Sequence, residues 1–197
     1  MTRIIGGSAK GRRLQTPAGD ATRPTSDRVR EALFSALEAQ LGSLHGLRVL
    51  DLYAGSGAVG LEAASRGAGA VTAVESDRRA AALITANARS LGFEVEVLAH
   101  PVARALAGRP GAAYDVAFLD PPYPMTEAEV VAALELLVGN DWLNPGAAVV
   151  LERSARSVEP GWPNGLGPLR HKKYGETMLW YLRRADESDR SAPGDRS

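Results

Sequence analysis

The stretch that decides the fold is Asp51-Leu-Tyr-Ala-Gly55-Ser-Gly57-Ala-Val-Gly60. It follows an apolar segment, 47–52, that has the composition of a buried β-strand, and it opens a segment with helical character, 57–65. Glycines at this spacing allow a tight turn between a strand and a helix, and they let the backbone approach a bound ligand closely. The stretch therefore predicts a ligand-binding turn at the start of an α/β domain.

Strand and helix patterns alternate around this turn. The expected strands are 47–52, 70–75, 94–98, 114–119 and 147–151, and the expected helices are 57–65, 77–91, 102–106 and 127–138. This order, with apolar and β-branched strands, predicts a mostly parallel sheet covered by helices on both faces. Two further segments, 169–174 and 177–182, flank Gly175-Glu176 and predict an antiparallel hairpin at the C-terminal end.

The two ends of the chain differ from this alternating middle. Residues 3–17 place apolar positions on either side of a glycine- and lysine-rich centre, which predicts a basic hairpin or arm. A helix is expected to begin at Asp27, capped by Thr25 or Ser26. The last residues are polar and predict a disordered tail. The expected units are an arm over 1–22, one domain over 23–184 and a tail over 185–197.

Composition excludes several classes of site. The 197-residue chain has 45% hydrophobic residues and no cysteine, which excludes disulfides, thiolate zinc sites and a cysteine nucleophile. Its three histidines are scattered, so we expect no metal. The first residues lack an apolar core of signal-peptide length, and no segment is long enough to span a bilayer. We expect a soluble, cytoplasmic protein, and nothing in the sequence requires more than a monomer.

Charge is zero overall but unevenly distributed. Residues 1–34 carry seven basic and three acidic side chains, and residues 170–184 carry five and one, whereas 35–169 carry nine basic and fifteen acidic. Basic ends around an acidic body are expected if the ends grip phosphates. Solvated charge on an ordinary surface is the competing interpretation.

Two acidic residues indicate which ligand the glycine turn serves. Glu75, at the end of the second expected strand, is placed to accept hydrogen bonds from ribose hydroxyls, so an NAD-dependent enzyme is one interpretation. Asp51, however, ends the first strand, where a carboxylate would repel the phosphates of a dinucleotide. S-adenosylmethionine has no phosphate, and a carboxylate can help to hold its methionine ammonium. Asp51 therefore favours S-adenosylmethionine as the cofactor.

The motif Asp120-Pro121-Pro122-Tyr123 follows the expected strand 114–119, which places it at the carboxyl edge of the sheet beside the cofactor. An exocyclic amine on a base is a poor nucleophile because its lone pair is delocalised into the ring. The Asp120 carboxylate and the Pro121 carbonyl are suited to accept both N–H groups and so to aim the lone pair at the methyl donor. Tyr123 offers an aromatic face for a base that has left its stack. The motif predicts methylation of an exocyclic base nitrogen.

Other interpretations remain open on these residues. A similar tetrapeptide would serve an adenine-N6 methyltransferase of DNA or RNA, because any exocyclic amine poses the same problem. A third interpretation is a non-catalytic RNA-binding protein with the same fold. It predicts that Asp120→Ala leaves cellular function intact, while charge reversal at Arg12 and Arg13 abolishes it.

Taken together, the motifs resemble the RsmD family of 16S rRNA (guanine-N2)-methyltransferases over residues 3–182. The matching pieces, in the family's order, are Arg3-Ile-Ile-Gly-Gly with Lys10-Gly-Arg-Arg-Leu14, Arg23-Pro-Thr-Ser-Asp27-Arg-Val-Arg-Glu31-Ala-Leu-Phe34, the glycine turn, Asp120-Pro-Pro-Tyr123 and Lys173-Tyr-Gly-Glu-Thr177. The resemblance implies a Rossmann-like class I methyltransferase fold with a seven-stranded sheet. It also implies methyl transfer to N2 of guanine 966 in 16S rRNA, within the small ribosomal subunit or an assembly intermediate.

The resemblance further implies roles for individual residues. Catalysis falls to Asp120, Pro121, Pro122 and Tyr123. The cofactor-binding residues are Arg23, Pro24, Thr25, Asp51, Tyr53, Ala54, Gly55, Ser56, Gly57, Glu75 and Ser76. The RNA-binding residues are Arg3, Lys10, Arg12, Arg13, Lys172 and Lys173. One departure concerns the segment 98–102, which lacks the acid or amide that many relatives place near the donor's adenine, so that contact is unassigned. The sequence leaves open whether the arm is ordered without RNA, although its glycines favour an unordered arm.

Overall fold

The computed structural model describes residues 2–17 and 26–186, and Arg23, Pro24, Thr25 and most of the expected tail lie outside them. Its helices are α1 (Asp27–Leu41), α2 (Ala58–Ser65), α3 (Arg78–Leu91), α4 (Val102–Leu106) and α5 (Glu127–Gly139). Its strands are β1 (Thr2–Arg3), β2 (Arg13–Leu14), β3 (Arg48–Leu52), β4 (Ala70–Val74), β5 (Glu96–Leu98), β6 (Tyr114–Leu119), β7 (Leu143–Ser154), β8 (Leu166–Tyr174) and β9 (Thr177–Arg184).

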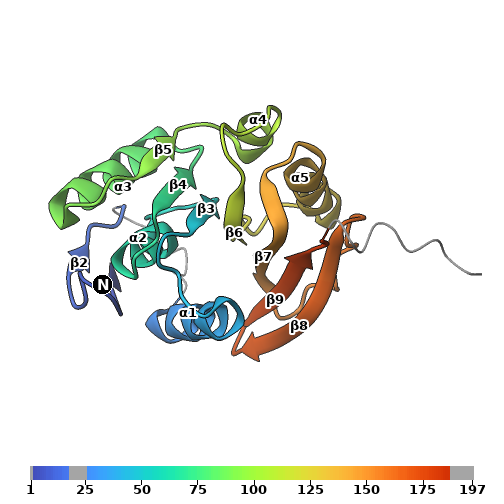
Figure 1. The fold of residues 1–197 in the computed structure, drawn as a ribbon, viewed down its shortest axis with the longest axis horizontal. Helices are drawn as coiled ribbons and strands as arrows, with labels where there is room; N and C mark the ends of the chain where they lie inside the picture. Colours follow the sequence, from blue (N-terminus) through green and yellow to red (C-terminus); the bar gives the residue numbers. More distant parts are fainter. Residues whose placement is uncertain (1, 18–25, 187–197) are drawn as a thin grey trace, which may run out of the picture.

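Seven of the strands form one sheet in the order β5-β4-β3-β6-β7-β9-β8 (Figure 1). The pairs from β5 to β7 are parallel, and β9 pairs antiparallel with both β7 and β8. The predicted parallel sheet with an antiparallel C-terminal hairpin is thus confirmed. The short antiparallel pair β1-β2 forms the N-terminal arm.

Two apolar layers hold helices to the two faces of the sheet. Side chains of α1 and α2 pack on one face, where β6, β7 and β9 also contribute to the cluster. Side chains of α4 and α5 pack on the other face. Successive side chains of a strand point to opposite faces of the sheet. The position of a residue in its strand therefore determines which helix layer its side chain faces.

Local signals fixed several element boundaries. Ser26 caps α1 by accepting the Val29 amide at 3.2 Å, so that the helix begins at Asp27 as predicted. The strand β7 is much longer than expected. Its first residues include Pro145 and Gly146, which read as a turn in the sequence, and its pairing with β6 shifts register there. An irregular strand start tolerates both residues.

Candidate active site

The sheet reverses its strand order between β3 and β6. From β3 the chain builds outward through β4 and β5, and it then returns to add β6 and β7 on the other side. Ligands of open α/β sheets bind outside the carboxyl ends of the strands at such a point. Asp51 lies in β3, and Asp120 directly follows β6, with Leu52 opposite Leu119 in the parallel pair. The structure therefore brings the two acidic residues to the same edge of the sheet from neighbouring strands, where the charge of Asp51 affects Asp120.

The three glycines of the turn serve different purposes. Gly55 has φ 56°, and a Cβ there would meet nothing within 4 Å, so the backbone faces open space where a ligand can approach. Gly57 has φ 77°, and a Cβ there would lie 2.9 Å from Ile84 Cγ2. At Gly60 a Cβ would lie 3.2 Å from Asp51 Oδ2, so this glycine allows α2 to pack closely on β3.

Asp51 is only 1% exposed, and its Oδ2 accepts the Gly60 amide at 2.9 Å. Burial raises the pKa of Asp51 to about 8; the Gly60 hydrogen bond opposes the shift, and the nearby Glu75 adds to it. A cation bound beside this buried carboxyl favours its ionised form and offsets the desolvation that raised its pKa. A phosphate in the same place would make ionisation still less favourable. The Asp51 carboxyl therefore fits an ammonium group and disfavours the diphosphate of NAD.

Glu75 follows β4 and braces the glycine turn. Its Oε2 accepts the Gly55 amide at 2.7 Å, and its Oε1 accepts the Asp77 amide at 2.9 Å. Each carboxylate oxygen has a second lone pair that remains suited to a ribose hydroxyl. Ser76, beside it, is exposed. Tyr53 has φ 57° and packs against the α4 and α5 layer, and burial raises its pKa to about 12, so its hydroxyl stays protonated.

The Asp-Pro-Pro-Tyr turn leads from β6 toward α5. Burial raises the pKa of Asp120 well above its usual value, with further increases from Glu152 and Asp51 and an opposing effect from Arg153. Tyr123 is 81% exposed, and its hydroxyl donates to Ser154 Oγ at 3.2 Å. The turn thus combines a half-buried acid with an aromatic ring open to solvent.

Two residues at the end of β7 escaped the sequence analysis. Arg153 donates to the Met125 carbonyl at 3.2 Å and pairs with Glu127, so it fastens the chain just after the Asp-Pro-Pro-Tyr turn. Glu152 directly follows Leu151, which pairs with Leu119 in the register of β6 and β7. Glu152 therefore lies beside Asp120. An acid directly after an apolar strand was the signal that could have found it.

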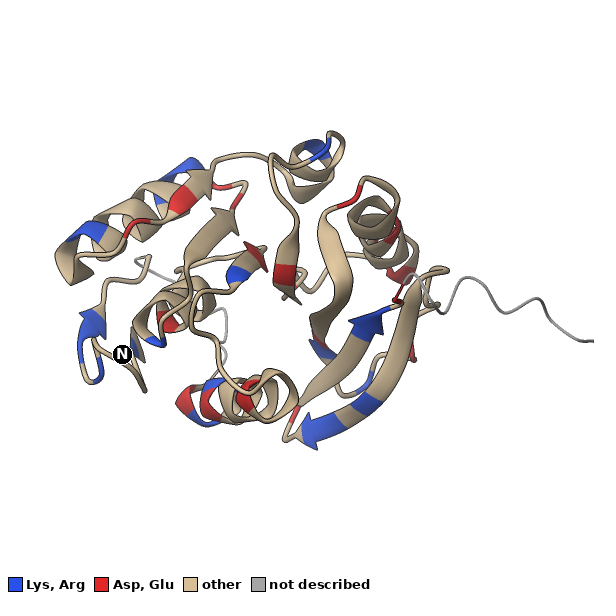
Figure 2. Cartoon of the chain, in the orientation of Figure 1, with Lys and Arg blue, Asp and Glu red and all other residues tan. Residues whose placement is uncertain are grey.

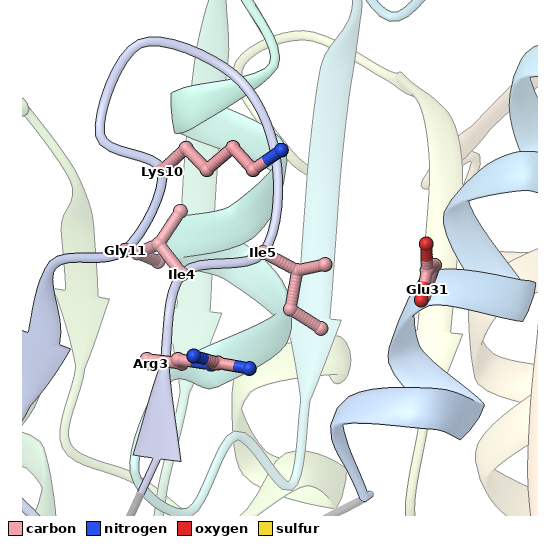
Figure 3. Close-up of a pocket in the computed structure, with 6 residues that line it drawn as sticks. All are labelled: Arg3, Ile4, Ile5, Lys10, Gly11 and Glu31. Carbon is pink, nitrogen blue, oxygen red and sulfur yellow. The ribbon is translucent and has the colours of Figure 1, made fainter.

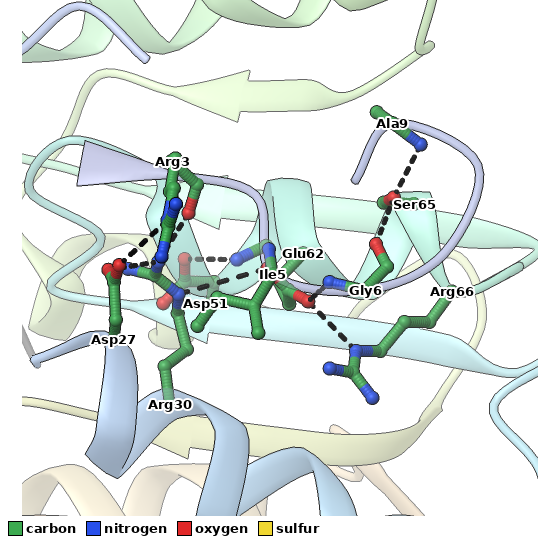
Figure 4. Close-up of polar contacts among 11 residues, drawn as sticks. Arg3, Ile5, Gly6, Ala9, Asp27, Arg30, Asp51, Glu62, Ser65 and Arg66 are labelled. Carbon is green, nitrogen blue, oxygen red and sulfur yellow. Dashed lines mark hydrogen bonds and ion pairs between the residues drawn. The ribbon is translucent and has the colours of Figure 1, made fainter. Parts of the chain in front are cut away.

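The arm is anchored to α2 by buried polar side chains of that helix (Figure 4). Glu62, which is fully buried, accepts the amides of Ile5 at 2.8 Å and Gly6 at 2.7 Å. Ser65 Oγ accepts the Ala9 amide at 2.9 Å. The glycines permit this close approach, because a Cβ at Gly7 would lie 1.9 Å from the Ser65 carbonyl oxygen.

A buried arginine ties the arm to α1 as well. Arg30 is 1% exposed, pairs with Asp27 at 3.0 Å and donates to the Arg3 carbonyl (Figure 4). Its Nε lies 3.8 Å from Glu62 Oε2. Desolvation lowers the pKa of Arg30, and the two acids oppose that effect. The arm, α1 and α2 therefore meet at one charged junction whose centre, formed by Arg30 and Glu62, is buried.

The predicted RNA-binding cations fall into two groups that lie apart in Figure 2. On the arm, Arg3 pairs with Asp27 at 3.2 Å, Arg12 donates to the Ser90 carbonyl at 2.9 Å, and Arg13 is exposed. Arg3 and Lys10 also line a hollow of about 230 Å³ that opens toward α1 (Figure 3). Lys172 and Lys173 are exposed on β8. Neither group touches Asp51 or Asp120 through any contact of the described residues.

The described ranges hold neither a metal-binding cluster nor a membrane-spanning helix. Over residues 2–17 and 26–186 no group of three or more His, Asp or Glu side chains is arranged to hold a metal ion. No helix in the same part of the chain is long and apolar enough to cross a membrane.

Comparisons with known proteins match the chain over most of its length. The family model described as conserved hypothetical protein 95 matches residues 2–183. The chain is 32% identical to "Ribosomal RNA small subunit methyltransferase D" of Escherichia coli K12, covering 96% of this chain and 93% of that one. The counterpart of the same name from Haemophilus influenzae is 38% identical over 76% of this chain and 77% of its own.

Solved structures extend the comparison to the fold. The structure of yhhF from Escherichia coli superposes with a TM-score of 0.83 at 32% identity, covering 94% of this chain and 99% of that chain. The magnesium protoporphyrin IX methyltransferase of Synechocystis, solved with bound SAM, has a TM-score of 0.61 at 16% identity and covers 79% of each chain. At that identity the second likeness shows the class I methyltransferase fold alone.

Proposed function

The chain belongs to the family of conserved hypothetical protein 95, the RsmD family of methyltransferases, and from this premise we propose that it methylates the exocyclic N2 of a guanine in 16S rRNA. The donor in this proposal is S-adenosylmethionine. The target is guanine 966, in the small ribosomal subunit or an assembly intermediate. Curated members of the family carry the name of a small-subunit rRNA methyltransferase, which supports the RNA substrate.

One observation carries the proposal: Asp51 and Asp120 lie at the ends of neighbouring parallel strands, on the two sides of the strand-order reversal. A donor held at Asp51 and a base held at Asp120 would share one crevice. Methyl transfer would require this adjacency, because the base nitrogen and the methyl donor must be held next to each other in the reactive orientation.

The donor side follows from the residues of the glycine turn. Asp51 would hold the methionine ammonium, Glu75 the ribose hydroxyls, and the backbone of 53–57 would line the cofactor where Gly55 faces open space. Ser76 would border the ribose, and Arg23, Pro24 and Thr25 would close over the methionine end. The cofactor supplies a methyl group activated by its bond to a sulfonium.

The acceptor side is built by the Asp-Pro-Pro-Tyr turn. The Asp120 carboxylate and the Pro121 carbonyl accept the two N–H groups of the amine. The contact to the charged Asp120 contributes about 1.5–3 kcal/mol. The cofactor, held by Asp51 and Glu75, would supply the methyl group, and the Asp120 carboxylate, which faces the amine, would accept the proton that the nitrogen gives up. Pro122 stiffens the turn, and Tyr123 stacks on the base for about 1–3 kcal/mol.

The basic segments complete the proposal. Arg3, Lys10, Arg12 and Arg13 on the arm, with Lys172 and Lys173 on β8, would bind the phosphate backbone of rRNA. Such contacts position the RNA without reading its sequence. The residues around Asp120 must therefore select the base.

The test is methyl transfer from labelled S-adenosylmethionine to small subunits purified from cells that lack this gene. Nucleoside analysis of the product should show N2-methylguanine at the single predicted position. Label on adenine with none on guanine would overturn the proposal in favour of an adenine-N6 methyltransferase. An absence of label on active, undermethylated subunits would contradict the rRNA substrate.

A further inference from the structure

The base site contains a second acid on the same side of the sheet as Asp120. Leu119 and Leu151 pair in register and both face the α4 and α5 layer. The residues that follow them, Asp120 and Glu152, therefore face the opposite side, toward α1. The partner of Glu152 on β9 is Leu179, which packs in the α1 layer, and this agrees with the assignment.

Electrostatics places the two acids close together as well. The charge of Glu152 raises the pKa of Asp120, so the pair lies within range of a direct interaction. The neighbouring Arg153 follows the opposite alternation and pairs with Glu127 of α5 on the far side. The site thus offers acceptor oxygens from two adjacent strands toward one ligand.

The Watson–Crick edge of guanine matches two adjacent acceptors. It presents the N2 amine and, directly beside it, the N1–H, both of which are donors. Adenine presents its N6 amine beside N1, which carries a lone pair and no hydrogen. A flipped base is read at this edge, so a second acid beside the amine-binding acid distinguishes the two purines.

We propose that Glu152 is a specificity-determining residue that accepts the N1–H of the target guanine while Asp120 binds its N2 amine. The inference rests on the proposed function and deepens it by naming what selects guanine. An adenine placed with its amine at Asp120 sets its N1 lone pair against the Glu152 oxygens. A site built to bind a substrate N–H rejects an analogue that lacks it more strongly than an apolar pocket rejects an extra group.

The test compares two substrates and two enzymes. Small-subunit RNA is assembled with either guanine or 2-aminopurine at the target position; 2-aminopurine keeps the exocyclic amine but has no hydrogen on N1. Wild type and Glu152→Gln are compared by kcat/KM on each substrate. Because 2-aminopurine also lacks the O6 oxygen, only the change in the guanine to 2-aminopurine ratio between the enzymes reports the N1 contact.

The wild-type ratio should fall by roughly tenfold to a hundredfold in Glu152→Gln, since one hydrogen bond to a charged acceptor is replaced by an amide that also donates to N1. Glu152→Ala should lower the guanine to 2-aminopurine ratio as well. Glu135 is an exposed acid on α5, and the control variant Glu135→Gln should leave the ratio unchanged. Calorimetric binding of S-adenosylmethionine checks that each variant is folded. An unchanged ratio in both Glu152 variants overturns the inference, whereas a wild type that labels no guanine overturns the proposed function itself.

Discussion

Asp51→Asn tests how the buried acid of the glycine turn binds a cation. The asparagine amide oxygen keeps the hydrogen bond from the Gly60 amide but does not titrate. In the wild type, burial holds the pKa of Asp51 at about 8, so the folded chain retains a proton that the unfolded chain releases above about pH 4. The free energy of unfolding must therefore fall as pH rises between these two values.

The magnitude follows from the shift. Between its ordinary pKa and pH 7 the carboxyl spans about three pH units, and each unit corresponds to about 1.4 kcal/mol, so wild type loses about 4 kcal/mol of stability from this residue by pH 7. The asparagine variant loses none of it. Urea unfolding at pH 4.5 and pH 7 should show the difference as a flatter pH dependence in the variant.

Cofactor binding should show the opposite pH dependence, with an affinity that rises as the pH rises. A cationic ligand favours the ionised carboxyl, so below pH 8 the affinity of wild type for S-adenosylmethionine should weaken about tenfold per unit of falling pH. Binding at pH 7 should release nearly one proton, which calorimetry in buffers of different ionisation enthalpy measures. Asp51→Asn should bind more weakly at pH 7 and release no proton at this residue. Equal affinities and equal proton release in both proteins between pH 5.5 and 7 would refute the assignment of Asp51 to the ammonium.

Three further predictions concern the other parts of the site. Asp120→Ala should lose most turnover while its affinity for S-adenosylmethionine, measured by calorimetry, is retained; near-normal turnover would rule out the assigned role. Gly7→Ala should destabilise the chain in urea unfolding because its Cβ would meet the Ser65 carbonyl oxygen at 1.9 Å. The matched control Gly11→Ala, at φ 82° with nothing within 4 Å, should cost only the backbone strain of about 1 kcal/mol, and equal losses would contradict the packing argument. Replacing Arg12 and Arg13 by Gln should reduce the salt dependence of RNA binding by a log–log slope of about 1.5, with kcat at saturating RNA unchanged. A slope equal to that of wild type would remove both residues from the RNA interface.

The features predicted best from the sequence are those set by residues close to one another along the chain. The Ser26 cap, the glycine turn and the strand before Asp120 each depend on neighbours within a few residues, and their positions were predicted closely. The mostly parallel sheet followed from the alternation of strand and helix patterns, and the antiparallel hairpin followed from the segments around Gly175-Glu176. These features place Asp51 and Asp120 in one crevice before any coordinates are known.

Contacts between distant segments could not be predicted in this way. Glu62 reads as an ordinary polar position in a helix, and its two bonds to the arm join residues 56 and 57 positions apart. Glu152 and Arg153 acquire their roles only through the register of β7 against β6, and β7 itself begins with residues typical of a turn. Patterns of hydrophobicity specify which face of an element is buried, and they do not specify which polar group lies across from it.

The helix α2 connects the donor side of the crevice to the arm. Its Gly60 amide braces Asp51, and two and five residues later Glu62 and Ser65 bind the arm backbone. At a rise of about 1.5 Å per residue, these anchor points lie within about 8 Å of each other along one helix. Displacing the arm would remove two amide donors from the Glu62 carboxylate, and each hydrogen bond to a charged group contributes about 1.5–3 kcal/mol. The arm is therefore fastened to the same helix that supports Asp51, and RNA bound there, as proposed, would be held close to the donor side of the site.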